Sequence, residues 1–289
     1  MKSNYWLALA FMGLAGAAIA AAPKADKKAE AGGDAFWARY AEVAQGAQRS
    51  AENKARDQYR HPKETLEFFG LKAGQTVLEI TPGGGWYTEI LGPLMKGHGK
   101  LTAAIVDPSS LEKESTRDYY KNNNQKYRDK LAADPASYDQ VEVLEFNLNE
   151  PKFGPGGTYD LVMTFRNVHN WISSKADAAM FKGFYAALKP GGVLGVEEHR
   201  AKQGATMEET FKSGYLPEDY VIKLATDAGF KLDKKSEVNA NPKDTKDYAE
   251  GVWTLPPSLT LKDKDRDKYL AIGESDRMTL RFVKPASTK

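Results

Sequence analysis

Residues 76–91 read TVLEITPGGGWYTEIL, and the rest of the chain is organised around this stretch. Val77, Leu78 and Ile80 at its start suit a strand that is buried on both faces. Gly83, Gly84 and Gly85 allow backbone angles and close approaches that a Cβ atom would block. A segment with helical spacing follows, so the order is strand, glycine turn and helix N-terminus, as in the nucleotide pockets of α/β sheets. The glycines alone are equally compatible with a plain turn between two core elements.

The composition is that of an ordinary globular protein. The chain has 289 residues, of which 41% are hydrophobic and 28% charged, so we expect a substantial core. Its 41 lysines and arginines nearly balance 39 aspartates and glutamates, which leaves a formal net charge of +2. This balance gives no support to a nucleic-acid-binding surface. We therefore expect no nucleic-acid partner.

The first residues have the pattern of a secretory signal peptide. Lys2 precedes an apolar run over residues 5–22, and Ala18-Ile19-Ala20 offers small residues for cleavage. A membrane anchor is the weaker alternative, because small residues fill the second half of the run. We expect a signal peptide over residues 1–20, a flexible lead-in over 21–33, and a periplasmic or secreted protein with no stable membrane anchor after cleavage. The sequence has no cysteine, which excludes disulfides and thiolate metal sites.

Residues 34–61 are expected to form a helical segment that precedes a main domain at 62–289. Apolar side chains recur at helical spacing from Phe36 onward. Arg60 and His61 close this segment, and composition alone favours a solvated helix end for both.

Further apolar runs alternate with segments of helical spacing along the main domain. This alternation predicts a parallel sheet with right-handed crossovers between its strands. The helical segment 111–131 carries three tyrosines, but its polarity favours an exposed crossover helix over a binding element. The expected strands after the opening stretch are residues 100–106, 141–146, 159–165, 193–196, 230–238 and 278–283.

Polar side chains gather where these strands end, and ligands of open α/β sheets bind at the carboxyl ends of the strands. Asp107 follows the second strand, about 20 residues beyond the glycine turn, where an acid accepts hydrogen bonds from ribose hydroxyls. An aspartate that starts a turn is nearly as good an interpretation. Asn147 follows the third strand. The fourth strand runs into residues 166–171 (RNVHNW) and the fifth into residues 197–200 (EEHR), which are rich in groups that bind or react.

The pattern resembles the class I S-adenosylmethionine-dependent methyltransferases over about residues 57–285. Residues 79–85 (EITPGGG) match the first motif of that superfamily, acid-x-Gly-x-Gly-x-Gly, with Thr81 in place of the first glycine. Residues 188–192 (LKPGG) before the fifth strand are a frequent feature of the same superfamily. The resemblance implies a Rossmann-like α/β fold with a seven-stranded, mostly parallel sheet and helices on both faces.

Within the superfamily, the chain is similar to a group of exported predicted methyltransferases. This likeness implies export but carries little biochemistry; our hypothesis is methyl transfer to a small acceptor, which the sequence does not name. The shared segments are residues 60–62 (RHP), 82–91 (PGGGWYTEIL), 166–171, 199–201 (HRA) and 273–278 (GESDRM).

The resemblance implies S-adenosylmethionine as the cofactor, bound at the opening stretch. Gly83 and Gly85 would supply close backbone packing, and Glu79 an acid near the amino acid moiety. Trp86 and Tyr87 offer aromatic faces to the sulfonium cation. A dinucleotide is less suitable, because position 88 lacks the third glycine of its fingerprint. The implied cofactor-binding residues are Glu79, Thr81, Gly83, Gly85, Trp86, Tyr87, Asp107 at the ribose, Asn147 at the adenine, and Arg166.

Methyl transfer depends mostly on proximity and orientation, with a base only where the acceptor loses a proton. His169 and His199 are the candidate bases, since each follows the carboxyl end of a central strand and histidine titrates near neutrality. A structural histidine that bonds a backbone carbonyl is an equally good interpretation of each. Asn167 completes the candidate catalytic set. The residues assigned to the acceptor, whose carboxylate or phosphate would suit arginine, are Arg60, His61 and Arg200.

Two other functions are compatible with the sequence. S-adenosylmethionine is a cytoplasmic metabolite, so export also suits a binding protein that keeps the fold without methyl transfer. Thr81 favours this alternative, because its side chain would crowd the cofactor. A third interpretation uses the two histidines with Glu197 or Glu198 as metal ligands or acid–base groups. No His-x-x-x-His spacing supports it, so we expect no metal site.

Overall fold

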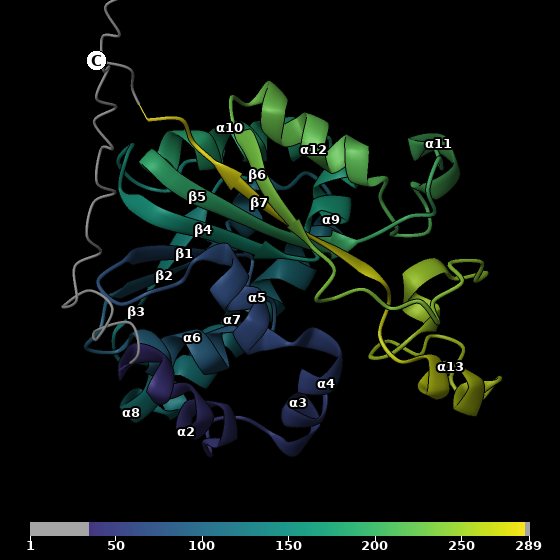
Figure 1. The fold of residues 1–289 in the computed structure, drawn as a ribbon, viewed down its shortest axis with the longest axis horizontal. Helices are drawn as coiled ribbons and strands as arrows, with labels where there is room; N and C mark the ends of the chain where they lie inside the picture. The colour runs from purple at the N-terminus through teal and green to yellow at the C-terminus, as the bar shows by residue number, and fades with distance from the viewer. Residues whose placement is uncertain (1–34, 287–289) are drawn as a thin grey trace, which may run out of the picture.

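The computed structural model describes residues 35–286, which form a seven-stranded sheet in the order β3-β2-β1-β4-β5-β7-β6 (Figure 1). Strand β7 runs antiparallel to both of its neighbours, while the other pairings are parallel. The Rossmann-like fold with a mostly parallel sheet, predicted from the sequence, is therefore confirmed. The strands are β1 (Thr76–Ile80), β2 (Lys100–Val106), β3 (Val141–Phe146), β4 (Tyr159–Phe165), β5 (Leu188–His199), β6 (Lys231–Ser236) and β7 (Arg277–Val283).

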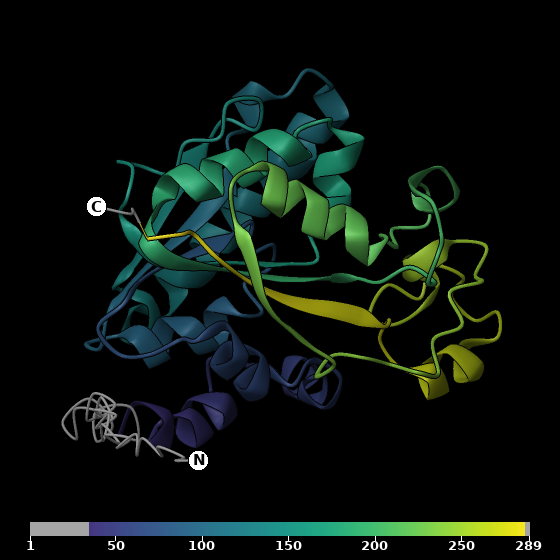
Figure 2. The same cartoon turned by 45° about the horizontal axis from the view of Figure 1, so that its top comes forward.

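Helices cover both faces of the sheet, with α5 and α6 on one side and α10 and α12 on the other (Figures 1 and 2). The helices are α2 (Tyr40–Gln45), α3 (Ala51–Ala55), α4 (Asp57–Arg60), α5 (Pro62–Phe69), α6 (Thr88–Met95), α7 (Glu114–Ala133), α8 (Pro135–Tyr138), α9 (Val168–Ser173), α10 (Asp177–Ala187), α11 (Met207–Thr210), α12 (Glu218–Asp227) and α13 (Arg266–Ile272), with 3₁₀ turns η1 (Pro108–Ser110) and η2 (Gly251–Thr254).

Each face of the sheet has its own apolar core. Along β1, Val77 packs with α5 and α6, while Leu78 packs with the phenylalanines of α10. Successive side chains of a strand point to opposite faces, so apolar residues at consecutive positions, such as Val77 and Leu78, must be covered on both sides. Burial on both faces explains why apolar residues predominate in the central strands.

The strands expected from the sequence are all present, with differences at their ends. Strand β5 begins at Leu188 rather than at position 193, because Leu188 already pairs with Tyr159 before the register shifts along the LKPGG segment. The polar stretch 239–276 contributes no strand within the described residues and contains only η2 and α13 as helical elements.

The N-terminal helical segment packs against the main domain. Its described part forms the short helices α2, α3 and α4, since Gly46 is extended and ends α2. The Arg39 guanidinium donates hydrogen bonds to the carbonyls of Pro93 and Leu94 in α6, and Phe36 is buried against the same region. The expected signal peptide over 1–20 and lead-in over 21–33 lie outside the described residues. Among the helices that are described, none is long and apolar enough to cross a membrane.

A glycine in β5 sets how closely α5 approaches the sheet. A Cβ atom at Gly195 would lie 2.4 Å from Cγ of Phe69 in α5, far inside van der Waals contact. We predict that Gly195→Ala lowers the free energy of unfolding by about 1–3 kcal/mol, because Phe69 must leave its place. Urea denaturation of Gly195→Ala, Phe69→Leu and the double variant measures this. The double variant should lose less stability than the sum of the two single losses, and simple additivity would contradict the contact.

Candidate functional site

A cleft of about 520 Å³ opens at the carboxyl ends of β1 and β2. This is the edge at which parallel α/β sheets bind their ligands. The walls of the cleft come from the turn after β1, the end of β2, the first half of α7, and α9 with the residues that flank it. The lining residues are Thr81, Pro82, Gly83, Ile105, Val106, Lys113, Thr116, Tyr119, Tyr120, Asn123, Asn124, Asn167, Asn170, Ser173 and Ser174.

The turn after β1 needs left-handed backbone angles. Thr81, Gly83 and Gly85 have φ values of 48°, 58° and 78°. Thr81 therefore occupies a conformation that favours glycine, which is the residue the methyltransferase motif has there, and this conformation costs a threonine about 1 kcal/mol. The Thr81 hydroxyl oxygen is buried beside the cleft and has no hydrogen-bond partner. An unpaired buried hydroxyl next to a cavity fits a ligand that completes its hydrogen bonding.

Glu79 lies beneath the turn rather than on the cleft wall. Its carboxylate accepts a hydrogen bond of 2.7 Å from the Thr88 hydroxyl, which also contacts the Tyr127 hydroxyl. Burial raises the pKa of Glu79 to about 7, although Thr88 and Lys130 act in the opposite direction. The Tyr127 ring also explains why position 85 is a glycine, because a Cβ atom there would lie 3.1 Å from the ring.

The aromatic pair after the glycines points away from the cleft. The Trp86 ring lies between the guanidinium groups of Arg49 and Arg60, at 5.1 and 4.7 Å, and its indole N–H donates to the Asn53 carbonyl. The Tyr87 ring stacks on Phe165 with centroids 3.5 Å apart. The structure thus places both aromatic residues in the packing between α6 and its neighbours, and neither lines the cleft.

Two polar residues at strand ends act as turn caps in the described structure. The Asp107 carboxylate accepts hydrogen bonds from the backbone N–H and the hydroxyl of Ser109. The Asn147 side-chain oxygen accepts from the backbone N–H of Asn149. The Asp107 contacts match the turn alternative that the sequence left open, and neither residue lines the cleft.

Helix α7 supplies cleft residues that the sequence reasoning missed. Tyr119 and Tyr120 line the cleft together with Asn123 and Asn124, although the segment was expected to be an exposed crossover helix. The Asn124 side chain donates a hydrogen bond of 2.8 Å to the Val106 carbonyl and so attaches α7 to the end of β2. The signal was the grouping of two tyrosines with two asparagines one turn later, which places both pairs on one side of a helix.

Asn167 joins the two central strands at the edge of the cleft. Its side-chain amide donates to the Ile80 carbonyl at 3.0 Å and to the Thr164 hydroxyl at 3.1 Å. This residue is buried and lines the cleft, so its position is set by both β1 and β4.

His169, Glu198 and His199, called here the histidine–glutamate cluster, come together at the carboxyl ends of β4 and β5. Nδ1 of His169 lies 2.9 Å from Oε1 of Glu198, and the two imidazole rings are 5.3 Å apart. Nδ1 of His199 lies 2.6 Å from the Ser275 hydroxyl. Burial lowers the pKa of His199 well below its usual value, and the neighbouring His169 and Arg166 act in the same direction.

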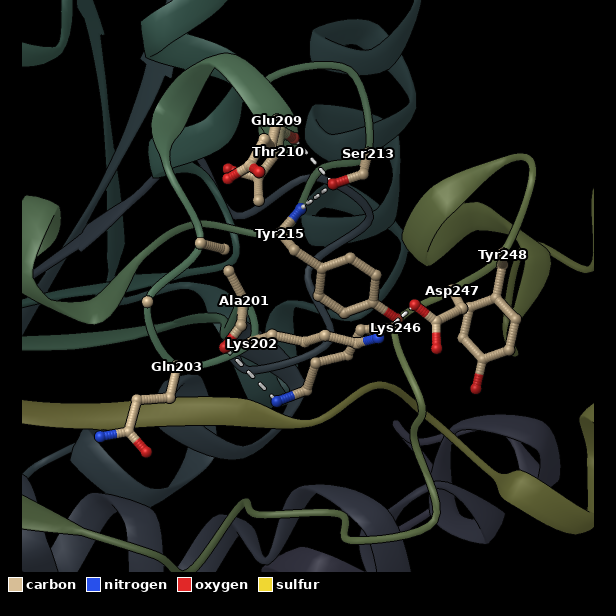
Figure 3. Close-up of a pocket in the computed structure, with 12 residues that line it drawn as sticks. Ala201, Lys202, Gln203, Glu209, Thr210, Ser213, Tyr215, Lys246, Asp247 and Tyr248 are labelled. Atoms are coloured by element: carbon tan, nitrogen blue, oxygen red, sulfur yellow. Dashed lines mark hydrogen bonds and ion pairs between the residues drawn. The ribbon is translucent and has the colours of Figure 1, made fainter.

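A second cavity, of about 490 Å³, lies between the segments 201–215 and 246–248 (Figure 3). Tyr215 stands in its wall, where its hydroxyl donates to Asp244 and its ring lies 6.4 Å from that of His199. The lysines of this cavity are paired, Lys246 with Asp276 at 2.7 Å and Lys202 with Asp247. The cavity therefore offers little free positive charge to an anionic ligand.

A family model described as "Methyltransferase domain" matches residues 53–234, which is more than half of the chain. The chain belongs to the methyltransferase domain family. No curated protein matches it.

Solved structures share the fold of this methyltransferase domain. A SAM-dependent methyltransferase from Aquifex aeolicus is 20% identical, with a TM-score of 0.52, and covers 80% of this chain and 93% of its own. A SAM-dependent methyltransferase from Methanosarcina mazei is 13% identical, with a TM-score of 0.51, and the match covers 77% of this chain and 97% of the other. The [4+2]-cyclase SpnF is 15% identical, with a TM-score of 0.53, and the match covers 84% of this chain and 86% of the other. At these identities the likeness shows the fold alone.

The methyltransferase domain also contains a buried arginine–glutamate cluster made of Arg56, Arg60, Glu197, Glu274 and Arg277. The Glu274 carboxylate pairs with Arg56 at 2.7 Å and Arg60 at 2.9 Å, and Arg277 bridges Glu274 and Glu197 at 3.2 and 2.9 Å. The Tyr87 hydroxyl donates to Glu197. Arg60 is thus held inside the protein at the junction of α4, β5 and β7.

The remaining residues assigned to ligands lie around this cluster. Burial lowers the pKa of Arg166, while the nearby carboxylates of Glu274 and Glu197 act in the opposite direction. The Nε atom of Arg166 is buried and has no hydrogen-bond partner. His61 lines a small cavity of about 190 Å³. Arg200 forms paired hydrogen bonds with both Glu237 and Asp276, so its guanidinium is engaged within the protein.

The arginines around Glu274 lower its pKa from 4.5 to about 2, although burial opposes them. Since the folded pKa lies below the unfolded one, this pairing stabilises the fold above pH 4.5 and is lost as the pH falls toward 2. We predict that Glu274→Gln costs about 3–5 kcal/mol at pH 7, because it leaves buried arginines unpaired. The difference in the free energy of unfolding between the variant and the wild type should shrink by about 2 kcal/mol between pH 7 and pH 3.

Urea denaturation at several pH values between 3 and 7 measures this gap. Glu150→Gln is the matched control, because the Glu150 side chain is 76% exposed and should show no such dependence. A stability difference for Glu274→Gln that stays constant with pH would exclude the proposed linkage.

Proposed function

We propose that the protein is a methyltransferase that binds S-adenosylmethionine in the cleft and methylates a small acceptor. The observation that carries this proposal is the position of the cleft at the carboxyl ends of β1 and β2, walled by the glycine turn that the family motif describes. The match to the methyltransferase domain family supports it. We further propose, from the signal-peptide pattern alone, that the protein acts in the periplasm or outside the cell.

The residues of the cleft fit this cofactor. A Cβ atom at Gly83 would meet no atom within 4 Å, so the glycine leaves open space beside the cleft. The Thr81 hydroxyl is free to bond a ligand, and Tyr119 and Tyr120 offer aromatic faces to an adenine ring or a sulfonium cation. When bound, S-adenosylmethionine supplies an electrophilic methyl group. The cleft residues bind and orient it, which accounts for most of the catalysis in methyl transfer.

We predict micromolar binding of S-adenosylmethionine and of its demethylated product by the mature protein, measured by calorimetry. Thr81→Val keeps the branched shape but removes the hydroxyl, so the dissociation constant should rise about 2- to 12-fold, the value of one hydrogen bond. Thr81→Ser keeps the hydroxyl and serves as the matched control. Equal affinities of the Val and Ser variants would exclude a contact between Thr81 and the cofactor.

We assign to His169 the role of the base that takes a proton from the methyl acceptor. This residue lies on α9 between Asn167 and Asn170, which both line the cleft. The Nδ1 atom of His169 contacts Glu198, so the Nε2 atom of His169 is free to take a proton from the molecule that is methylated. Asn167 holds the ends of β1 and β4 together and so fixes the start of α9 relative to the glycine turn.

We predict that His169→Ala lowers turnover about 100-fold or more and leaves the dissociation constant of S-adenosylmethionine unchanged. His199→Ala should also lower turnover. Formation of the demethylated cofactor with a panel of small hydroxyl, amine and thiol acceptors measures both variants. His98→Ala is the control, because His98 is exposed and remote in sequence from both clusters. Full activity of both cluster variants would contradict the assignment.

A second candidate function is ligand binding without methyl transfer. The strained Thr81 favours it, since the family motif has a glycine there. The structural likeness to a protein named as a [4+2]-cyclase also shows that this fold serves more than one function. Absence of both binding heat and thermal shift at millimolar S-adenosylmethionine would support this alternative and exclude the methyltransferase.

A further inference from the structure

Three metal-binding side chains from two distant segments meet in the histidine–glutamate cluster. One ligand atom from each of His169, Glu198 and His199 lies within 4.8 Å of the others. Donors around a tetrahedral zinc ion lie about 3.3 Å apart, given Zn–N bonds of about 2.0–2.1 Å. The Nδ1 atom of His169 and Oε1 of Glu198 are 2.9 Å apart, so small side-chain rotations suffice to admit an ion.

The Glu198 carboxylate is buried, and no lysine or arginine among residues 35–286 lies within ion-pair distance of it. Its side chain is completely inaccessible to solvent, and its only ion-pair partner among residues 35–286 is His169. The backbone N–H groups of His169 and His199 also donate to it. The buried carboxylate of Glu274, by contrast, has arginine partners. A buried carboxylate without lysine or arginine is the environment in which a metal cation supplies the missing charge.

We propose that His169, Glu198 and His199 bind one divalent transition-metal ion. Two imidazoles and one carboxylate form a donor set that suits zinc, iron or nickel and does not suit magnesium or calcium, which prefer oxygen ligands. Three protein ligands leave further coordination positions for water or for a substrate atom.

Contacts around the cluster hold the ligands in place. The Ser275 hydroxyl bonds Nδ1 of His199 at 2.6 Å and leaves Nε2 as the free donor atom of that ring. Such outer contacts fix the orientation of metal-binding histidines. The ring of Trp253 lies 6.1 Å from that of His169, and the ring of Tyr215 lies 6.4 Å from that of His199, so aromatic side chains limit the access of water.

The sequence raised these residues as metal ligands only as its weakest interpretation, because no His-x-x-x-His spacing supported a site. His169 and Glu198 are separated by 29 positions, and they meet only because β4 and β5 are neighbours in the sheet. Glu198 and His199 are adjacent in sequence, but they are the last two residues of β5, where the chain leaves the regular strand.

The role of the ion, though not the site itself, rests on the proposed function. With an ion bound, His169 is a ligand and no longer a base. The ion then takes over the activation of the acceptor, since a metal-bound hydroxyl or water loses its proton far more readily than a free one.

The test is metal binding by the untagged mature protein, stripped with a chelator and titrated with Zn²⁺ in a calorimeter. We expect one ion per chain, and elemental analysis of the dialysed complex should agree. Glu198→Gln and His199→Ala should each weaken binding at least 10-fold, because the loss of even an outer contact to a metal ligand typically costs about 10- to 100-fold in affinity. His98→Ala should bind as the wild type does. Circular dichroism checks the fold of each variant. If a variant of a buried ligand does not fold, His169→Asn, which changes the more exposed ligand, replaces it in the test.

Two further readouts make the outcome unambiguous. Co²⁺ in place of Zn²⁺ should give visible absorption bands of a nitrogen- and oxygen-ligated ion, and these bands should disappear in His169→Asn. Zn²⁺ binding that survives in all three cluster variants, or no binding by the wild type, would overturn the site. S-adenosylmethionine binding is measured on the same samples. A wild-type protein that binds Zn²⁺ but not S-adenosylmethionine would contradict the proposed function and would still support the metal site.

Discussion

The ion pair between Glu274 and Arg60 joins parts of the chain that are 214 positions apart. Through Arg277, the same carboxylate is linked to Glu197 in β5, and through Glu197 to Tyr87 beside the glycine turn. The N-terminal helices, the turn after β1 and the closing strand β7 therefore share one buried network. Removing one partner of such a network leaves uncompensated charge in the interior, which costs far more than the intact pair contributes. The geometry of the cleft depends on this junction, because α4 and the start of α6 pack against it.

Strand β5 connects the two clusters of charged side chains. Glu197 and Glu198 are consecutive, and successive residues of a strand point to opposite faces of the sheet. Glu197 accordingly meets Arg277 and Tyr87, while Glu198 meets His169. One strand end thus supplies a structural ion-pair network on one face and a reactive group on the other. Strand β4 contributes to the same edge through Arg166, Asn167 and His169, so the chemistry of this protein is concentrated beyond β4 and β5.

The sequence predicted the architecture well because apolar runs and glycines are local signals. The run in β1 and the glycines after it required a buried parallel strand and a left-handed turn, and both are present. The site was less predictable. Trp86 and Tyr87 follow the glycines directly, yet their rings turn into the packing around Arg60 and Phe165, because α6 begins at Thr88 and fixes their direction. Tyr119 and Tyr120 lie in a polar helix, and only the placement of α7 over β2 brings them to the cleft.

The sequence by itself determined the α/β fold, the position of the ligand-binding turn and the set of reactive residues at the strand ends. These follow from hydrophobic runs, glycine conformation and the rule that parallel sheets bind ligands at their carboxyl edge. Only the tertiary structure decided which of these residues meet. Thr81 at the cleft, His169 beside Glu198 and Arg60 against Glu274 are contacts between segments brought together by strand order and helix packing. No local pattern encodes such contacts, because they depend on the order β3-β2-β1-β4-β5-β7-β6 and not on the order of the strands in the chain.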